Sequence, residues 1–114
     1  MLNNVVLVGR LTKDPETVTT EKGNKKTSVT LAIGRPYKNY NGEYETDFIR
    51  VSLWNGIAEN TCEYCKKNDI IGVKGRIHSN MVENNEEKKY FTEVVAEKVT
   101  FLSSKRNDEK TKEN

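Results

Sequence analysis

Residues 48–54 read Phe-Ile-Arg-Val-Ser-Leu-Trp, and they alternate between two kinds of side chain. Successive side chains of a β-strand point to opposite faces, so this alternation predicts a strand. One face carries the aliphatic residues Ile49, Val51 and Leu53 and belongs to a core. The other face carries Phe48, Arg50, Ser52 and Trp54. Exposed aromatic rings with a cation between them form a surface for a flexible polyanion whose rings can stack, and single-stranded nucleic acid is such a ligand.

The size and composition of the chain limit its possible functions. It has 114 residues, which suits one compact domain. There are 19 Lys and Arg residues against 17 Asp and Glu, and the net charge of +2 is too small to indicate a polyanionic partner by itself. The sequence contains no run of about 18 apolar residues that could span a membrane. Residues 1–8 lack the cationic start of a signal peptide, so we expect a cytoplasmic protein with no membrane partner.

The pattern of apolar residues predicts five strands and one helix. The strands are expected at residues 4–11, 26–35, 47–55, 70–78 and 90–102, and the helix at residues 56–67. Polar loops are expected at residues 36–46, where Asn41-Gly42 marks a hairpin tip, and at residues 80–89. Residues 103–114 have no apolar side chain. We therefore predict a folded domain over residues 1–102 and a short disordered polar tail over residues 103–114.

This order of elements indicates an all-β fold. Five strands with one helix between the third and the fourth fit a five-stranded Greek-key OB-fold barrel, whose helix closes one end. The strand residues expected to point inward include Val29, Leu31, Ile33, Ile71, Val73 and Ile77, and the apolar stripe of the helix is Ile57, Ala58, Thr61, Tyr64 and Cys65. Glycines at positions 9, 34, 72 and 75 suit the sharp strand bends that closing a barrel requires.

The outward positions of the predicted strands combine cations with aromatic rings. The cations are Arg10, Arg35, Arg50, Lys74 and Arg76, and the aromatic residues are Phe48, Trp54 and, at the mouth of the hairpin, Tyr37. In a closed barrel these side chains can line one basic groove, in which cations pair with phosphates and rings stack on bases. Stacking tolerates every base, so the pattern specifies a class of ligand and no particular sequence. The alternative is that Phe48 and Trp54 cover a second hydrophobic layer or a subunit interface.

The sequence shows no recognisable catalytic or metal site. Cys62 and Cys65 are spaced as C-x-x-C, but zinc needs two more ligands and His78 is the only histidine. Both cysteines lie near the C-terminal end of the predicted helix, where the helix dipole disfavours a thiolate, so we expect them to pack. Glu45 and Asp47 lie beside a turn with no nucleophile near them in sequence. We therefore expect no catalysis and no metal site.

Four blocks of sequence follow one another along the chain. They are LNNVVLVGRLTKDPE (residues 2–16), TDFIRVSLWNGIAEN (46–60), EYCKKNDIIGVKGRI (63–77) and TEVVAEKVTFL (92–102). Together they closely resemble the bacterial single-stranded DNA-binding protein (SSB) family. The resemblance implies an OB-fold homotetramer that binds single-stranded DNA without strong sequence preference and protects it during replication, recombination and repair. It also implies base stacking at Tyr37, Phe48 and Trp54, with no cofactor and no catalysis.

The chain departs from the family pattern in two places. The family usually has a further stacking aromatic in the hairpin between the last two strands, where this chain has Met81 and Val82. This hairpin is therefore not among the expected stacking positions. The typical family C-terminus is a long tail with an acidic tip and a final apolar residue, whereas this sequence stops at Lys112-Glu113-Asn114. We therefore expect no recruitment of repair proteins through an acidic tip.

Three other functions stay open on the sequence alone. A relative with the same fold could act as a replication-restart or assembly adaptor, which would bury Phe48 and Trp54 in a protein interface. An OB domain could instead bind RNA, because stacking does not detect the 2′-hydroxyl group. A small redox protein would use Cys62 and Cys65. A titration of Trp54 fluorescence with oligo-dT, oligo-U and duplex DNA separates most of these functions.

Overall fold

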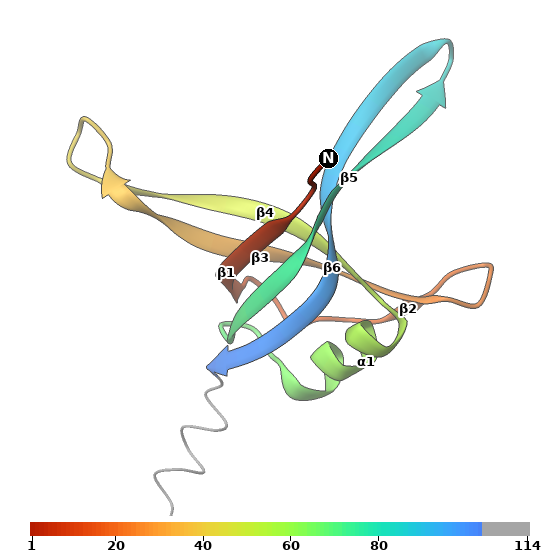
Figure 1. Ribbon diagram of the computed structural model, residues 1–114, viewed down its shortest axis with the longest axis horizontal. Coiled ribbons are helices and arrows are strands. Elements are labelled where there is room, and N and C mark those ends of the chain that lie inside the picture. The colour runs from red at the N-terminus through yellow and green to blue at the C-terminus, as the bar shows by residue number, and fades with distance from the viewer. Residues whose placement is uncertain (104–114) are drawn as a thin grey trace, which may run out of the picture.

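Five long strands and one helix make up the computed structural model, which describes residues 1–103 (Figure 1). The strands are β1 (Val5–Leu11), β3 (Lys25–Lys38), β4 (Tyr44–Trp54), β5 (Ile70–Asn84) and β6 (Glu87–Ser103). The helix α1 (Asn55–Tyr64) lies between β4 and β5, and a two-residue strand, β2 (Val18–Thr19), pairs with β3. The polar tail predicted for residues 103–114 lies outside the described residues, apart from Ser103, which ends β6.

The long strands close into a barrel. The sheet order is β1-β5-β6-β4-β3, and β1 also pairs with β3 through Arg10↔Ala32 and Leu11↔Leu31, which completes the ring. All these pairings are antiparallel except the one between β4 and β6, which is parallel at Val51↔Val94 and Ser52↔Val95. The predicted five-stranded OB barrel with a helix between its third and fourth long strands is therefore confirmed.

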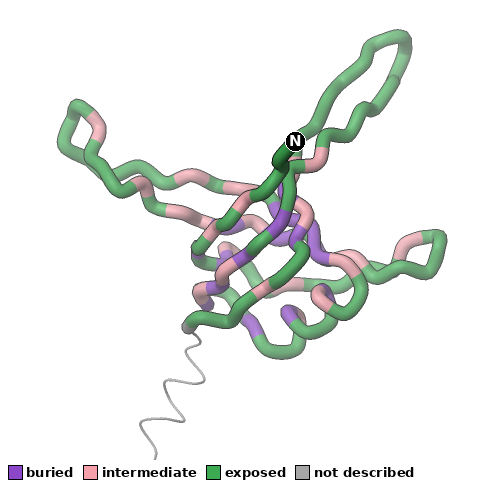
Figure 2. Tube along the Cα trace, viewed as in Figure 1, coloured by how far each residue is buried: buried purple, intermediate pink, exposed green. Residues whose placement is uncertain are grey.

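The core lies inside the barrel and under α1, where Figure 2 shows the buried residues gathered. Its fully buried members include Leu31, Leu53 and Ile71, each 0% exposed. The helix adds Ala58 and Thr61, and Cys65 immediately after it is also buried. These residues were expected to point inward from strand alternation and helical periodicity, and that prediction is confirmed.

Two predicted core residues are instead largely exposed. Ile77 is 48% exposed, because β5 has left the barrel at this point and runs out into a hairpin. Tyr64 is 54% exposed, because it is the last residue of α1 and its ring rests at the rim, 5.9 Å from the ring centre of Phe101. The helix ends at Tyr64 and not at Lys67 as predicted, since Cys65 takes an extended conformation.

Two hairpins project from the barrel as long arms (Figure 1). The predicted polar loops at residues 36–46 and 80–89 are therefore wrong over most of their length. β3 and β4 continue to a short loop in which the Asn39 N–H donates to the Glu43 carbonyl oxygen (2.8 Å). β5 and β6 meet at a two-residue turn, Asn85-Glu86, whose φ angles are 49° and 70°. A backbone ladder between two strands needs no apolar face, so polar segments can pair in this way.

Glycine is required where two strands approach most closely. A Cβ atom on Gly75 would lie 2.1 Å from the Val95 carbonyl oxygen, and one on Gly9 would lie 2.8 Å from Ile33 Cγ1. The register of the β5–β6 ladder shifts between Lys74 and Gly75, where β5 turns from the barrel into its arm. A Cβ atom on Gly34, by contrast, would have no neighbour within 4 Å. The register shift supports the expected strand bend at Gly75, whereas Gly9 is explained by its close approach to β3.

The helix found in residues 1–103 has 10 residues and is too short and too polar to cross a membrane.

Candidate nucleic-acid interface

The outer face of β4 presents Phe48, Arg50 and Trp54 beside a row of small side chains. The neighbouring β3 places Ala32 opposite Phe48, Thr30 opposite Arg50 and Ser28 opposite Ser52. Phe48 is 65% exposed, Arg50 is exposed and Trp54 is half-buried. Within residues 1–103 the guanidinium of Arg50 has no hydrogen bond or ion pair. Flat rings and an unpaired cation next to small residues leave room for a ligand to approach the sheet.

The outer face of β4 borders two depressions, and Ser52 lies between the residues that line them. Ser52 is 0% exposed and lies opposite Val95 in the parallel ladder, where β6 runs alongside β4. Phe48 and Arg50 line a depression of about 510 Å³ on one side. Trp54 lines a second depression of about 460 Å³ on the other. The single groove predicted from the sequence is therefore two adjoining hollows on one strand.

The first depression has a mostly apolar floor. Its other lining residues are Val5, Leu7, Ile49, Ile77, Thr92, Glu93 and Val94. Arg10 borders the same outer face, because its β3 partner Ala32 pairs in turn with Phe48. The Arg10 Nη1 donates to the Asn68 carbonyl oxygen (2.7 Å), which holds this cation at the edge of the face.

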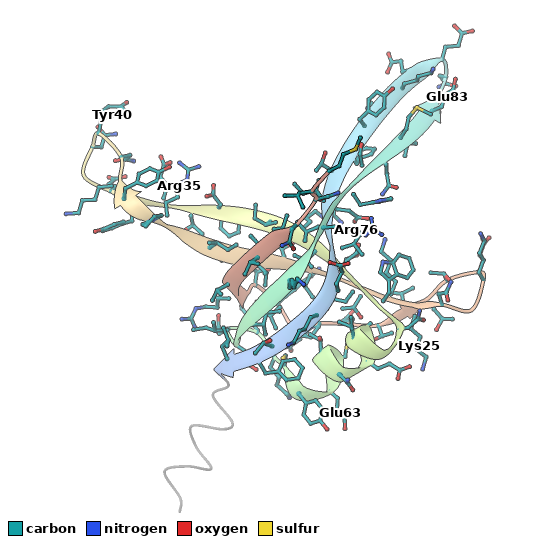
Figure 3. All side chains as sticks on the ribbon, in the orientation of Figure 1. Lys25, Arg35, Tyr40, Glu63, Arg76 and Glu83 are labelled. Atoms are coloured by element: carbon teal, nitrogen blue, oxygen red, sulfur yellow. The ribbon has the colours of Figure 1, made fainter. Side chains whose placement is uncertain are left out.

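The second depression is polar and joins Trp54 to the base of the β5–β6 arm. It is lined by Lys26, Trp54, Arg76, His78, Asn80, Glu93 and Val95. Lys26 lies opposite Trp54 in the β3–β4 ladder, and its Nζ is 5.2 Å from the ring centre. Figure 3 labels Arg76 where the arm leaves the barrel. The structure therefore brings together two predicted site residues, Trp54 and Arg76, from strands far apart in sequence.

Arg35 lies apart from this face. Its Nε donates to both carboxylate oxygens of Asp47 (3.2 Å each), its Nη2 donates to Asp47 Oδ1 (2.8 Å), and its Nη1 donates to the Glu45 carboxylate. Asp47 is the ladder partner of Ile33, so these bonds hold Arg35 on the inner side of the ribbon and away from Arg50. The prediction that Arg35 faces outward is therefore wrong, because alternation along β3 carries it to the side of Ile33, where two carboxylates bind it.

These bonds also change the titration of the Arg35 cluster. The hydrogen bonds from Arg35, together with its charge, lower the pKa of Asp47 below its ordinary value. The same hydrogen bond and the negative charge of Asp47 raise the pKa of Arg35. Both groups therefore stay charged near neutral pH. Glu45 and Asp47, which the sequence leaves without a role, hold the guanidinium in place.

Lys74 lies on a different surface of the barrel. Its ladder partners are Val6 and Lys98, and it lines a depression of about 350 Å³ with Val8 and Leu102. Val6 is 70% exposed, and Val8 and Leu102 are each 52% exposed. Lys74 is therefore not in the same hollow as Trp54 or Phe48, although the sequence groups all three.

Tyr37 lies on the β3–β4 arm. It is 63% exposed, and two further tyrosines, Tyr40 and Tyr44, are 97% and 65% exposed on the same arm. Figure 3 labels Tyr40 at the tip of this arm. The Lys38 Nζ lies 5.6 Å from the centre of the Tyr44 ring. The arm thus carries exposed aromatic rings well beyond the barrel.

Sequence reasoning missed some residues of this surface. Lys26 was placed at the start of a strand and given no role, although its register opposite Trp54 follows from pairing the two strands. The sequence also gives no role to His78, at the end of a predicted strand, or to Asn80, in the predicted loop at residues 80–89. The alternation of side chains continues through these positions once the strands are extended, and that continuation is the signal that could have identified them.

Cys62 and Cys65 are both free thiols, and they differ in burial. Cys65 is 3% exposed in the core, which confirms the prediction that it packs. The Cys62 Sγ lies 2.9 Å from Thr17 Oγ1 and 3.4 Å from Thr27 Oγ1. Over residues 1–103, no group of three or more His, Cys, Asp or Glu side chains is placed to bind a metal ion.

Comparison with known proteins agrees with this geometry. Residues 2–102 match the model of the Single-strand binding protein family. The chain is 50% identical over 108 residues to "Single-stranded DNA-binding protein 3" of Listeria innocua, a match that covers 94% of this chain and 68% of that protein. It is 47% identical over 106 residues to "Single-stranded DNA-binding protein B" of Bacillus subtilis, covering 92% and 94%. It is 50% identical over 103 residues to the "Single-stranded DNA-binding protein" of Halalkalibacterium halodurans, covering 90% and 61%.

Proposed function

The chain belongs to the Single-strand binding protein family, and we propose that it coats and protects single-stranded DNA during replication, recombination and repair, without strong sequence preference. The observation that carries the proposal is the outer face of β4. There Phe48, Arg50 and Trp54 lie in a row beside small residues of β3. Binding needs no cofactor and no bond-making step, so the protein acts by contact alone.

Each component of this face has a physical role in binding. A base stacked on an aromatic ring contributes roughly 1–3 kcal/mol, and every base has a face to stack. Arg50, Arg76 and Lys26 can neutralise phosphates, which releases counterions and makes affinity depend on salt. Bases in a duplex are already stacked on their neighbours, so this face selects single strands. Tyr37 extends the same chemistry onto the β3–β4 arm.

We also propose that the protein assembles as a homotetramer. The support is the exposed apolar surface formed by Val6, Val8 and Leu102, which together line one depression. Residues 5–9 of β1 pair with β5 alone, so one edge of this strand is available to a second copy. Light scattering at micromolar concentration tests this proposal, and a mass equal to one chain would contradict it.

A fluorescence titration tests the DNA-binding proposal directly. Trp54 is the single tryptophan of the chain, so its emission reports on the proposed groove. Oligo-dT should quench this emission in a saturable way, whereas duplex DNA at the same nucleotide concentration should not. Equal or tighter binding of oligo-U would favour the RNA-binding alternative. Failure of both oligonucleotides to bind would favour an adaptor that buries Trp54 and Phe48 in a protein interface.

A further inference from the structure

The β5–β6 arm has two distinct sides. Beyond the barrel the two strands pair residue by residue up to the turn at Asn85-Glu86, so their side chains alternate between the sides without a break. One side carries His78, Asn80, Val82, Lys89, Phe91 and Glu93. We call this the Trp54 side. The opposite side carries Ile77, Ser79, Met81, Lys88, Tyr90 and Thr92, and we call it the Tyr90 side. Figure 3 labels Arg76 at the base of this arm and Glu83 near its tip.

Hydrogen bonds between side chains indicate which side of the arm faces the depression that contains Trp54. His78 Nε2 and Asn80 Oδ1 are 2.8 Å apart, and Asn80 Nδ2 donates to Glu93 Oε1 (3.3 Å). All three residues line the depression that contains Trp54 and Arg76. Phe91 is the ladder partner of Asn80 and lies two residues from Glu93, so its side chain projects on this same side. Phe91 is therefore the next aromatic ring outward from Trp54 along this surface.

Phe91 has the features of a stacking position. Phe91 is 54% exposed, although burial of a phenylalanine ring is favourable, so the ring is available to a ligand. Lys89 follows it on the same side, which repeats on β6 the arrangement of ring and cation that Phe48 and Arg50 show on β4. Val82, its diagonal neighbour on β5, is small enough to leave the ring uncovered.

We propose that Phe91 stacks a base, so that single-stranded DNA runs from Trp54 past Arg76 and outward along the Trp54 side of the arm. This inference rests on the proposed function and assigns a stacking residue to an arm whose first strand, with Met81 and Val82, has no Phe, Tyr or Trp. The ring comes from the second strand instead. Tyr90, although adjacent in sequence and 69% exposed, points to the other side, where Ile77 and Thr92 line the depression of Phe48 and Arg50.

Two matched substitutions test this assignment by affinity. Phe91→Ala should weaken binding to a long oligo-dT by roughly 5- to 150-fold at fixed salt, the effect of losing one stacked base. Tyr64→Ala removes an exposed ring at the end of α1, outside both depressions, and should change the affinity less than about 2-fold by the same reasoning. Light scattering and thermal unfolding of both variants confirm that assembly and fold are intact.

A reporter experiment gives a second readout that folding defects cannot mimic. A Trp54→Phe background removes the single tryptophan of the chain and keeps an aromatic ring at position 54. A tryptophan placed by Phe91→Trp should then be quenched by oligo-dT, whereas one placed by Tyr64→Trp at the end of α1 should not. If the wild type binds oligo-dT and neither reporter differs from the other, the assignment of Phe91 is overturned while DNA binding stands. If the wild type fails to bind, the proposed function itself is overturned.

Discussion

The Lys26 ammonium lies 5.2 Å from the centre of the Trp54 ring, directly across one rung of the β3–β4 ladder. A cation over one ring face stabilises the ring position and leaves the charge close to any phosphate that follows a base stacked on Trp54. On the proposed function, we expect the two residues to act as one unit, in which the ring stacks on a base and the ammonium pairs with the following phosphate.

We predict that Lys26→Gln lowers the slope of log K against log salt by about 0.7, the value for one lost phosphate contact on a single strand. Lys25→Gln is the matched control, because it removes the same charge one residue away, where the Lys25 Nζ already pairs with Glu59 (2.6 Å). The control should change the slope less. Equal changes in both variants would mean that overall charge, and not the position beside Trp54, sets the salt dependence.

Stacking on the two rings of β4 gives a second prediction. Trp54→Ala and Phe48→Ala should each weaken binding to oligo-dT by roughly 1–3 kcal/mol, measured by fluorescence anisotropy of a labelled oligonucleotide. Trp54→Phe keeps a ring at the same place and should retain most of the affinity. An unchanged affinity in Trp54→Ala, with the fold intact, would show that this face does not hold the bases.

The Arg35 cluster predicts a contrast between two cations that the sequence treats alike. Arg50→Gln should reduce the salt slope by about 0.7, since its guanidinium is available to a phosphate. The double substitution Arg35→Gln with Asp47→Asn keeps the net charge and removes a paired arginine, so it should leave the slope unchanged. Salt titrations from low to moderate ionic strength measure both. A reduced slope in the double variant would show that Arg35 contacts phosphates and contradict its separation from the DNA-binding surface.

Alternation along the strands predicted most of the fold and the centre of the site. Buried positions such as Leu31, Leu53 and Ile71 follow a period of two, and that period follows from backbone geometry alone. Phe48, Arg50 and Trp54 were placed on one face for the same reason. The strand order could be recognised because a helix between two strands is a strong topological marker.

The arms and the charge pairs could not be predicted in this way. Segments with polar residues on both sides show no contrast of hydropathy, so residues 80–89 resemble a loop although they form a paired ribbon. The direction in which Arg35 points depends on its bonds to Asp47 and Glu45. These two residues lie on the other strand of a hairpin, and the sequence alone does not define the pairing register. Ile77 and Tyr64 are apolar residues at the right period, but the chain has left the core where they occur.

The two cysteines should respond differently to serine. Cys62→Ser should leave the free energy of unfolding nearly unchanged, because a hydroxyl group can take over the hydrogen bond with Thr17 Oγ1, now 2.9 Å from the sulfur. Cys65→Ser should lower the free energy of unfolding more than Cys62→Ser does, because Cys65 is 3% exposed and a hydroxyl group is more costly to bury than a thiol. Urea unfolding at one protein concentration measures both. Equal stabilities would indicate that the site of Cys65 already offers the hydroxyl a partner.

The last prediction concerns the crossing of β5 and β6 at Gly75. A Cβ atom there would lie 2.1 Å from the Val95 carbonyl oxygen and 3.2 Å from the Ala96 Cα, so Gly75→Ala forces two backbones apart at the point where the barrel passes into its arm. Overpacking of this kind costs about 1–3 kcal/mol and often more when backbone has to move.

Gly34→Ala is the control for this substitution, because its Cβ atom would have no neighbour within 4 Å and its φ is not in the left-handed region. It should be neutral, or more stable by about 0.4–1 kcal/mol, since alanine restricts the unfolded chain. Urea unfolding compares the two variants, and affinity for oligo-dT should fall only in Gly75→Ala, because the arm carrying Phe91 is displaced relative to Trp54. A Gly75→Ala protein as stable as Gly34→Ala would mean that the two strands separate here without penalty, and that the close contact does not hold the arm in place.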